Sequence, residues 1–252
     1  MMRPEQFFSW NMAAAVMIVL SLTMPPILPA ADKKGCVEGD CVNGSGTFVY
    51  PDGSTYKGGF RDGLRSGKGK LSYADGRFYS GGFRKDMKDG YGKYTSPDGR
   101  AYEGTFKDDR LNGRGTYRFE DGTVYKGEYK DDKFNGHGEL IFTDGRSYKG
   151  QLKDDRRHGK GRFVWKDGRV YEGDYVNDRM EGRGVYTFPD GARYAGPFKN
   201  DAFEGSGTFT YPDKRVYKGS FKEGYPHGKG VISYPDGRSE DVENVRGEKV
   251  EK

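Results

Sequence analysis

The chain has 252 residues, of which 33% are hydrophobic and 41 are glycine, while 19 Tyr, 16 Phe and 2 Trp supply a high aromatic content. A compact globular domain would carry more Leu, Ile and Val, and a disordered chain would be poor in aromatic residues. The net charge of +5, from 43 basic and 38 acidic residues, is weak evidence for nucleic-acid binding. The composition therefore indicates an ordered, extended β-structure with a thin apolar layer and no nucleic-acid partner.

The N-terminal segment, residues 1–30, differs in composition from the rest of the chain. Arg3 precedes the apolar run "MAAAVMIVLSLTM", which is followed by prolines and small residues. This order is typical of a secretory signal peptide, with cleavage expected after Ala30 or Ala31. The alternative is an uncleaved membrane anchor, because apolar flanks lengthen a run that is shorter than the roughly 20 residues that span a bilayer. Both interpretations place the remaining chain outside the cytoplasm, in a periplasmic or extracellular compartment.

The two cysteines, Cys36 and Cys41, lie just after this segment. In an oxidising compartment such a pair most simply forms a disulfide. A metal site would need further ligands nearby, and no histidine precedes His137. The sequence therefore favours a disulfide that stiffens the N-terminal end locally, and it predicts no metal site.

A repeat of 23 residues fills the chain after the leader. Each unit has a Tyr-x-Gly element, a Gly-x-Gly pair that begins eleven residues after the tyrosine, and an Asp nineteen residues after it. A strict period with atypical ends indicates a repeat array. We predict a degenerate capping repeat at 31–55, eight tandem repeats at 56–239 and a charged cap or tail at 240–252. The tyrosines are Tyr56, Tyr79, Tyr102, Tyr125, Tyr148, Tyr171, Tyr194 and Tyr217.

One unit predicts a β-hairpin. Stretches such as "YKGEYK" and "GELIFT" alternate in the manner of strands, and the Asp-Gly between them indicates a type I turn with Gly in the left-handed conformation. Lys214 replaces that Gly once and would have to adopt a positive φ. The opposite connection, "KDDRLNGRG" and its relatives, is expected to be a longer polar loop. Successive hairpins would then pair edge to edge in one antiparallel meander.

The aromatic residues and glycines of a unit fall on the same face of this expected sheet. Alternate residues of a strand share a face, so the Tyr-x-Gly-x-aromatic and Gly-x-aromatic-x-aromatic elements place rings beside glycines. Rings can then lie across bare backbone, as in aromatic rescue of sheet glycines. The predicted fold is all-β, an elongated single-layer antiparallel sheet forming a twisted or curved rod.

The unit Tyr-x-Gly-x-Phe … Gly-x-Gly … Asp-Gly, at a period of 23, closely resembles the MORN repeat. The resemblance covers roughly residues 33–239. It implies an elongated, curved or twisted antiparallel sheet, with roles in protein–protein assembly and in phospholipid binding.

Elements that would indicate an enzyme are missing from the sequence. The repeated "GKG" segments lack the frame of a phosphate-binding loop, and no Gly-x-Ser-x-Gly element is present. His137, His158 and His227 are expected in or beside polar loops of different units, and carboxylate doublets such as Asp108 with Asp109 are interpreted as loop residues that satisfy backbone N–H groups. We therefore expect a noncatalytic protein with no cofactor.

Two basic rows are the remaining candidates for a binding site. One follows the Asp-Gly turns, from Arg77 to Arg238. The other, five residues after each tyrosine, is the candidate anion-binding row, and Val176 is its exception. Such a row fits anionic headgroups or an acidic polymer, but the acidic residues beside it also fit a solvated edge that prevents association. The row comprises Arg61, Arg84, Lys107, Lys130, Lys153, Lys199 and Lys222.

Two functions follow from these features. The first is a scaffold that presents its sheet surface to another protein or to itself, because exposed aromatic surface usually binds something. The alternative is peripheral attachment to an anionic phospholipid membrane or an acidic envelope polymer through the basic rows.

Overall fold

The computed structural model describes residues 35–249, and all of their regular secondary structure is β-strand. The expected signal peptide at 1–30 lies outside the described residues. Within the described range the chain divides into two compact units, residues 35–143 and 144–249. No helix able to cross a membrane occurs between residues 35 and 249.

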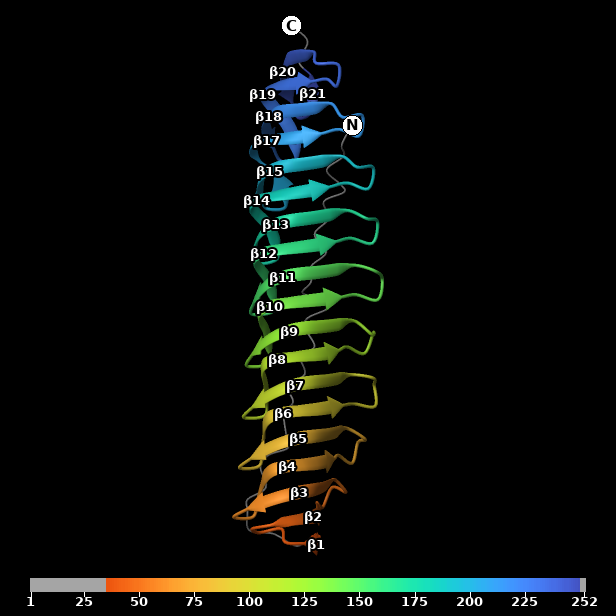
Figure 1. The fold of residues 1–252 in the computed structure, drawn as a ribbon, viewed down its shortest axis with the longest axis vertical. Coiled ribbons are helices and arrows are strands. Elements are labelled where there is room, and N and C mark those ends of the chain that lie inside the picture. The colour runs from red at the N-terminus through yellow and green to blue at the C-terminus, as the bar shows by residue number, and fades with distance from the viewer. Residues whose placement is uncertain (1–34, 250–252) are drawn as a thin grey trace. The chain divides into compact units, whose positions relative to one another are not determined.

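The unit of residues 35–143 is an open antiparallel meander, in which each strand pairs with the next along the chain (Figure 1). Its strands are β1 (Cys36–Gly39), β2 (Ser45–Val49), β3 (Thr55–Arg61), β4 (Leu64–Ser72), β5 (Phe78–Arg84), β6 (Met87–Thr95), β7 (Ala101–Lys107), β8 (Arg110–Arg118), β9 (Val124–Lys130) and β10 (Lys133–Ile141).

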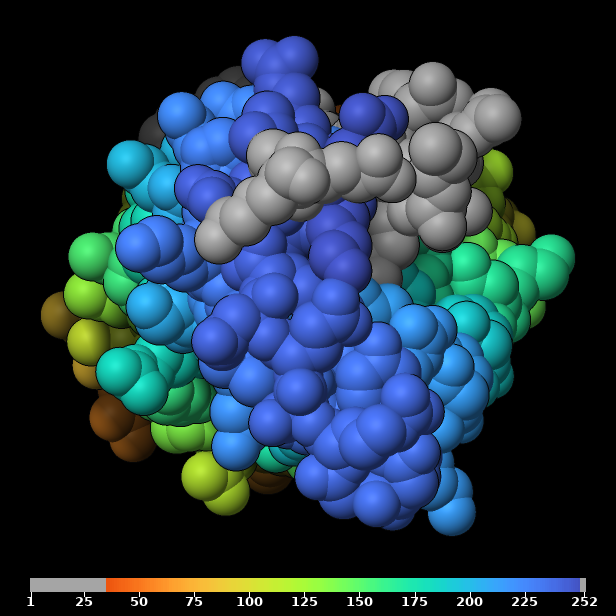
Figure 2. Space-filling view, turned by 90° about the horizontal axis from the view of Figure 1, so that it is seen from above, coloured from red at the N-terminus to blue at the C-terminus, as the bar shows by residue number. Residues whose placement is uncertain are grey.

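The unit of residues 144–249 is also an antiparallel meander, except that β16 and β17 both pair with β15. β20 and β21 lie at the end that faces the viewer in Figure 2. Both units confirm the all-β prediction of tandem hairpins. The strands of this unit are β11 (Ser147–Lys153), β12 (Arg156–Val164), β13 (Val170–Val176), β14 (Arg179–Thr187), β15 (Arg193–Lys199), β16 (Ala202–Phe203), β17 (Gly205–Thr210), β18 (Val216–Lys222), β19 (Tyr225–Ser233), β20 (Ser239–Val245) and β21 (Glu248–Lys249).

The Asp-Gly connections contain the predicted turn. Between β6 and β7, Gly99 has a φ of 90° and its N–H donates to the carbonyl of Ser96. Lys214 does adopt a φ of 69° in the equivalent place, and its N–H donates to Tyr211 in the same way. The turn therefore keeps its hydrogen bond even though Lys214, which is not glycine, must adopt a strained positive φ to form it.

The prediction of a long polar loop at the opposite connection was wrong. Only Asp108 and Asp109 lie between β7 and β8, with φ of 47° and 68°, and the flanking residues Lys107 and Arg110 are paired. Two positive φ values in a two-residue connection are the requirement of a type I′ turn, whose twist matches that of the strands. Asp and Asn tolerate this conformation better than most residues, which explains the acidic doublets.

A bulge follows this turn and explains the first glycine of Gly-x-Gly. In the β7–β8 ladder Gly104 pairs with Gly115 and Phe106 pairs with Leu111, so three residues of β8 oppose Thr105. Gly113 lies in this bulge with a φ of 78°. Glycine adopts this conformation without the cost that a Cβ imposes.

The second glycine of the pair is required by a tyrosine ring. The Tyr102 ring lies across Gly104 on its own strand and Gly115 on the next, and a Cβ added to either glycine would collide with that ring. The Tyr102 hydroxyl donates to the carbonyl of Thr105 at 3.0 Å. The ring is therefore held flat on the sheet, and all eight repeat tyrosines are at most 1% exposed.

Edge-to-face aromatic contacts join consecutive repeats on this side of the sheet, which we call the ring face. In residues 35–143, ring centroids along the series Tyr56–Phe83–Tyr79–Phe106–Tyr102 lie 5.0–5.1 Å apart. Equivalent contacts run through the other unit. This geometry adds roughly 0.5–1.5 kcal/mol per pair to the burial of each ring, so the ring face is a continuous core.

Ring-face variants should lose stability as core variants do. We expect Phe106→Ala to cost roughly 3 kcal/mol or more, and Gly127→Val to destabilise strongly because its side chain would enter the space of the Tyr125 ring. Chemical denaturation of each variant measures the effect. Lys107→Ala and Lys126→Val are matched controls, because they place the same side chains one residue away on the exposed opposite face. Equal stability of Gly127→Val and Lys126→Val would show that no ring lies on Gly127.

Candidate functional site

The face opposite the rings carries the exposed side chains, and we call it the polar face. Along β7 the buried Tyr102 and Phe106 alternate with Glu103, Thr105 and Lys107, which point the other way. The repeat tyrosines of the ring face are at most 1% exposed and are engaged in packing, whereas the most exposed side chains lie on the polar face. Candidate binding surfaces therefore lie on the polar face.

The candidate anion-binding row lies on the polar face, beside the type I′ turns. Each of its members is the last residue of a strand and is exposed. Arg84 is paired with Asp89 at 2.7 Å and with Asp108 at 3.2 Å. Lys130 has a second cation, Lys133, directly opposite it in the β9–β10 ladder. The structure thus brings these residues to one edge of each unit and in places doubles them.

The second basic row is neutralised by its own turns. Arg77 donates through its Nε to Asp75 at 2.6 Å, and its guanidinium lies 4.6 Å from the centroid of the Tyr73 ring. The hydrogen bond from the Arg77 backbone is the first cause that lowers the pKa of Asp75. Arg100, Arg146, Arg169, Arg215 and Arg238 make the equivalent Nε contact with an Asp two residues earlier, at 2.7 Å.

The second residue of each acidic turn joins neighbouring repeats. Asp109 accepts the N–H of Lys88 at 2.9 Å and donates its own N–H to the carbonyl of Lys88 at 3.0 Å. Asp132 makes the same two bonds with Leu111. These bonds confirm that the doublets satisfy backbone groups. The second Asp is therefore a structural clamp between repeats.

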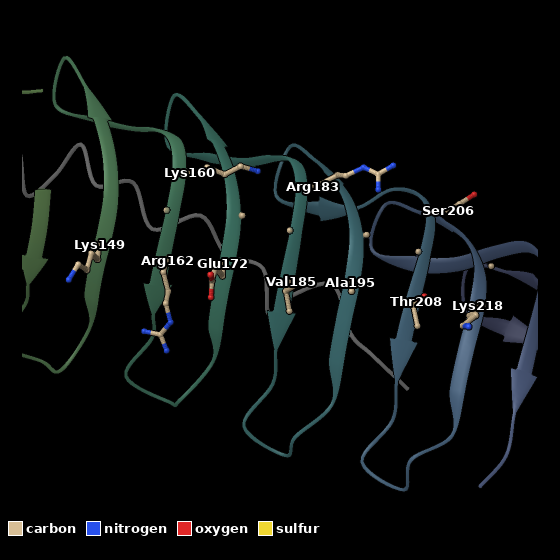
Figure 3. Close-up of a pocket in the computed structure, with 16 residues that line it drawn as sticks. Lys149, Lys160, Arg162, Glu172, Arg183, Val185, Ala195, Ser206, Thr208 and Lys218 are labelled. Carbon is tan, nitrogen blue, oxygen red and sulfur yellow. The ribbon is translucent and has the colours of Figure 1, made fainter. Parts of the chain in front are cut away.

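A groove runs along the polar face of residues 144–249. Its floor is bare glycine backbone, and two rows of side chains flank it, with Lys160, Arg183 and Ser206 on one side (Figure 3). The other side is formed by Lys149, Arg162, Glu172, Val185, Ala195, Thr208 and Lys218. The floor consists of Gly161, Gly173, Gly184, Gly196, Gly207 and Gly219. The same glycines receive tyrosine rings on the opposite face.

Cations predominate in this polar-face groove. Lys160 pairs with Asp174 at 2.6 Å, and Asp174 also accepts the N–H of Arg183 at 3.0 Å. Partial burial acts to raise the pKa of Asp174, but these hydrogen bonds outweigh it and the pKa is lowered. Lys149 and Lys218, toward the two ends of the groove, make no ion pair with another residue of 144–249. Sequence reasoning missed the groove, because it lies where the ring-facing glycines leave only backbone between two rows of polar-face side chains.

Lys88 is a buried amine on β6. Its side chain is 1% exposed and lies 5.6 Å from the Tyr79 centroid, while its Nζ is 4.0 Å from Asp109. Burial lowers its pKa to about 8. A lowered pKa is typical of catalytic lysines, but Lys88 occupies the position that the buried Leu111 has in the next repeat. We interpret it as a core residue held by cation–π contact.

The three histidines lie on strands and not in loops, because the expected loop is a two-residue turn. His137 is in β10, His158 in β12 and His227 in β19. Residues 35–249 contain no cluster of three or more His, Cys, Asp or Glu side chains able to hold a metal.

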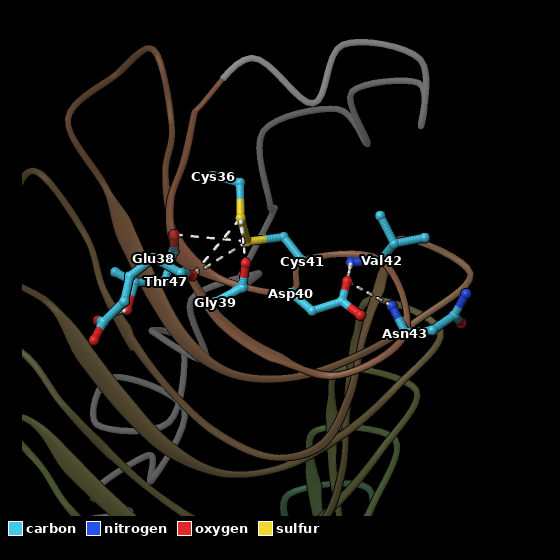
Figure 4. Close-up of a disulfide and its surroundings, with 8 residues drawn as sticks. All are labelled: Cys36, Glu38, Gly39, Asp40, Cys41, Val42, Asn43 and Thr47. Atoms are coloured by element: carbon cyan, nitrogen blue, oxygen red, sulfur yellow. Dashed lines mark hydrogen bonds between the residues drawn. A yellow bond between two sulfur atoms is a disulfide. The ribbon is translucent and has the colours of Figure 1, made fainter.

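Cys36 and Cys41 form a disulfide at the start of the described chain, with their Cα atoms 6.0 Å apart (Figure 4). Between them Asp40 accepts the N–H groups of Val42 and Asn43 at 2.7 and 3.1 Å. The bridge and this turn hold the connection between β1 and β2.

The contribution of Lys88 to the stability of the chain should rise with pH between about 8 and 10. The pKa of Lys88 is lower in the folded chain than its ordinary value of 10.5, so the unfolded chain binds more protons in this range and folding gains on the order of 2 kcal/mol. Burial raises the pKa of many tyrosines, among them Tyr56 and Tyr73 to about 12, so their summed contribution falls from about pH 9 and the total stability should fall as the pH approaches about 10. Urea denaturation at each pH measures this profile.

Lys88→Leu should lack this rise, because it removes the amine and installs the residue type of the next repeat. The free energy of unfolding of the wild type should therefore gain on that of Lys88→Leu by on the order of 2 kcal/mol between about pH 8 and 10. Lys93→Leu, an exposed change on the same strand, should preserve the rise. A rise of equal size in the Lys88→Leu variant would contradict the assignment.

Comparison with known proteins identifies the repeat. Nine consecutive segments match the MORN repeat, at residues 43–55, 56–76, 79–99, 102–124, 125–145, 148–168, 171–193, 194–214 and 217–237. No curated protein matches the chain. Among solved structures, the G-box domain of the microcephaly protein CPAP is 17% identical, with a TM-score of 0.41 over 80% of this chain and 100% of that one.

Two further solved structures are similar. The TCP10 domain of Danio rerio CPAP, as its E1021V mutant, is 15% identical, with a TM-score of 0.40 over 80% of this chain and 90% of that one. The Drosophila melanogaster SAS-4 TCP domain, in complex with a proline-rich motif of Ana2, is 11% identical, with a TM-score of 0.35 over 78% and 88%. The repeat matches cover most of the sequence, and the chain therefore belongs to the MORN-repeat family.

Proposed function

We propose that this chain is a noncatalytic, exported MORN-repeat scaffold that binds a partner protein through its polar face. The observation that carries this proposal is the polar-face groove, an open surface whose floor is formed by glycines that the core requires. An extended segment can lie on such a floor because no side chain rises from it. Self-association is a less favoured use. Only Asn244 and Val245 of β20 pair with β21 among the described residues, and the rest of that strand carries Glu240, Asp241 and Glu243, whose charges oppose pairing at an edge.

Filling the groove should abolish partner capture. Ala195→Trp places a large side chain in the groove, whereas Val176→Trp places the same side chain on the polar face outside its lining. Pull-down from the native envelope fraction should recover partners with the wild type and with Val176→Trp, and lose them with Ala195→Trp. If both variants capture partners as well as the wild type does, the groove is not the binding surface.

Export is the second element of the proposal, and the leader-like composition of residues 1–30 and the Cys36–Cys41 bridge support it. Protein recovered from its host should begin near Ala31 or Asp32. It should also resist alkylation at both cysteines until a reductant is added. A retained leader would mean a membrane-anchored scaffold, and free thiols would place the chain in a reducing compartment.

Binding to an anionic membrane is the second candidate function. The observation that favours it is the doubling of the candidate row at the turn edge, where Lys130 faces Lys133 and Lys107 faces Arg110. Arg110 is only loosely offset by Asp131 at 3.7 Å. Each cation near an anionic bilayer contributes about 1 kcal/mol.

Removing three of these cations together should therefore weaken vesicle binding by about 3 kcal/mol. The test is sedimentation of Lys107→Gln/Lys130→Gln/Lys133→Gln with phosphatidylserine-containing vesicles. A control triple variant, Lys57→Gln/Lys70→Gln/Lys93→Gln, has the same net charge but lies away from the turn edge. If both triple variants lose the same amount of vesicle affinity, net charge and not the row is the cause. If the turn-edge variant binds vesicles as well as the wild type does, the row is a solvated edge.

A further inference from the structure

We propose that the polar-face groove takes an extended acidic peptide of about nine residues, with carboxylates at both ends and small side chains in the middle. The proposal rests on the proposed function and names the chemistry of the partner segment. It follows from the charges at the two ends of the groove and from the short side chains between them.

One end of the groove has two cations in direct opposition. Lys149 and Arg162 are cross-strand partners in the β11–β12 ladder. Like charges in this position destabilise a sheet, and neither side chain has an ion-pair partner within 4.0 Å among the described residues of this unit. Arg162 also faces Glu172 across β12–β13, so one carboxylate partly offsets the pair. The remaining positive charge suits an anionic group of a ligand.

The other end of the groove has Lys218 on β18, and Arg183 on β14 lies between the ends across the glycine floor. Strands β11, β12, β13, β14, β15, β17 and β18 pair in this order. Six spacings of about 4.8 Å separate Lys149 from Lys218, or about 29 Å. At about 3.3 Å per residue, an extended peptide of about nine residues covers this distance.

The middle of the groove selects a peptide over other anions. Its flanking row has Val185, Ala195 and Thr208, which offer no charge and leave room for small side chains. A uniform polyanion would find no cation on this stretch of that row and would be repelled by Glu172. A planar bilayer would have to enter a hollow between two rows of side chains (Figure 3). A peptide can instead place its carboxylates only where the cations lie.

Two peptides of identical composition test the pattern of charge. We would measure, by anisotropy with a neutral fluorophore, binding of the full chain to "DEGAVAGED" and to "GADEVEDAG", both acetylated and amidated. The peptide with acidic ends should bind at least tenfold more tightly. The variant Lys149→Gln/Arg162→Gln should weaken its binding at least tenfold. The control Lys57→Gln/Lys70→Gln, an equally opposed pair in residues 35–143, should leave it unchanged.

Several results would overturn the proposal. These are equal affinity for the two peptides, equal loss in the two double variants, or tighter binding of polyphosphate than of "DEGAVAGED". Binding of phosphatidylserine vesicles that Lys149→Gln/Arg162→Gln abolishes would assign the groove to a membrane instead. Thermal melting of both double variants checks that each is folded. If neither peptide binds but Ala195→Trp still abolishes partner capture, the scaffold function stands and the acidic-peptide inference fails.

Discussion

A tyrosine ring lying flat on two glycines is the interaction on which the rest of the structure depends. Each ring covers a glycine of its own strand and one of the paired strand, and its hydroxyl reaches a backbone carbonyl three residues on. The ring needs both glycines, so Tyr-x-Gly and Gly-x-Gly recur together. It also needs cover, which the aromatic residue four positions on and its equivalent in the next repeat supply. A thin sheet thereby acquires a core without a second layer.

The connections between strands are as constrained as the core. The type I′ turn fixes two residues at positive φ, and the second of them, when Asp, donates its N–H to a carbonyl of the preceding repeat and accepts that residue's N–H with its carboxylate. Pro226 has no N–H to donate, and the turn residue opposite it is Gly247, which has no side chain to accept one. Only the bond from the Gly247 N–H to the Pro226 carbonyl remains there. Much of the charge that resembles a binding surface in the sequence is therefore engaged in holding repeats together.

The sequence predicts the ring face well because strand alternation and a fixed period leave no freedom there. It fails where one position accepts several residue types. Nine residues after the tyrosine the chain has Lys88, Leu111, Phe134 and Phe203, which show no shared chemistry, yet Phe203 stacks on Tyr194 at 3.9 Å. It also fails at the acidic turn, because polar composition indicates a loop without fixing its length. The groove was beyond prediction, since it is defined by which polar-face side chains flank the backbone on several paired strands, and no motif marks them.

The two faces of the sheet have different roles: the ring face stabilises the fold, and the polar face carries the side chains that vary between repeats. A residue beside a glycine points away from the rings. The same repeat position is therefore Ala195 in one repeat and Lys218 in the next, while the ring contacts of both repeats are the same. Charge can then vary from strand to strand on the polar face while the core repeats. A ligand crossing the strands reads one such position about every 4.8 Å. A ligand that crosses the strands is therefore recognised by the pattern of charged and small side chains along this axis. A chain with few aliphatic residues can provide such a pattern without changing the ring contacts that stabilise its fold.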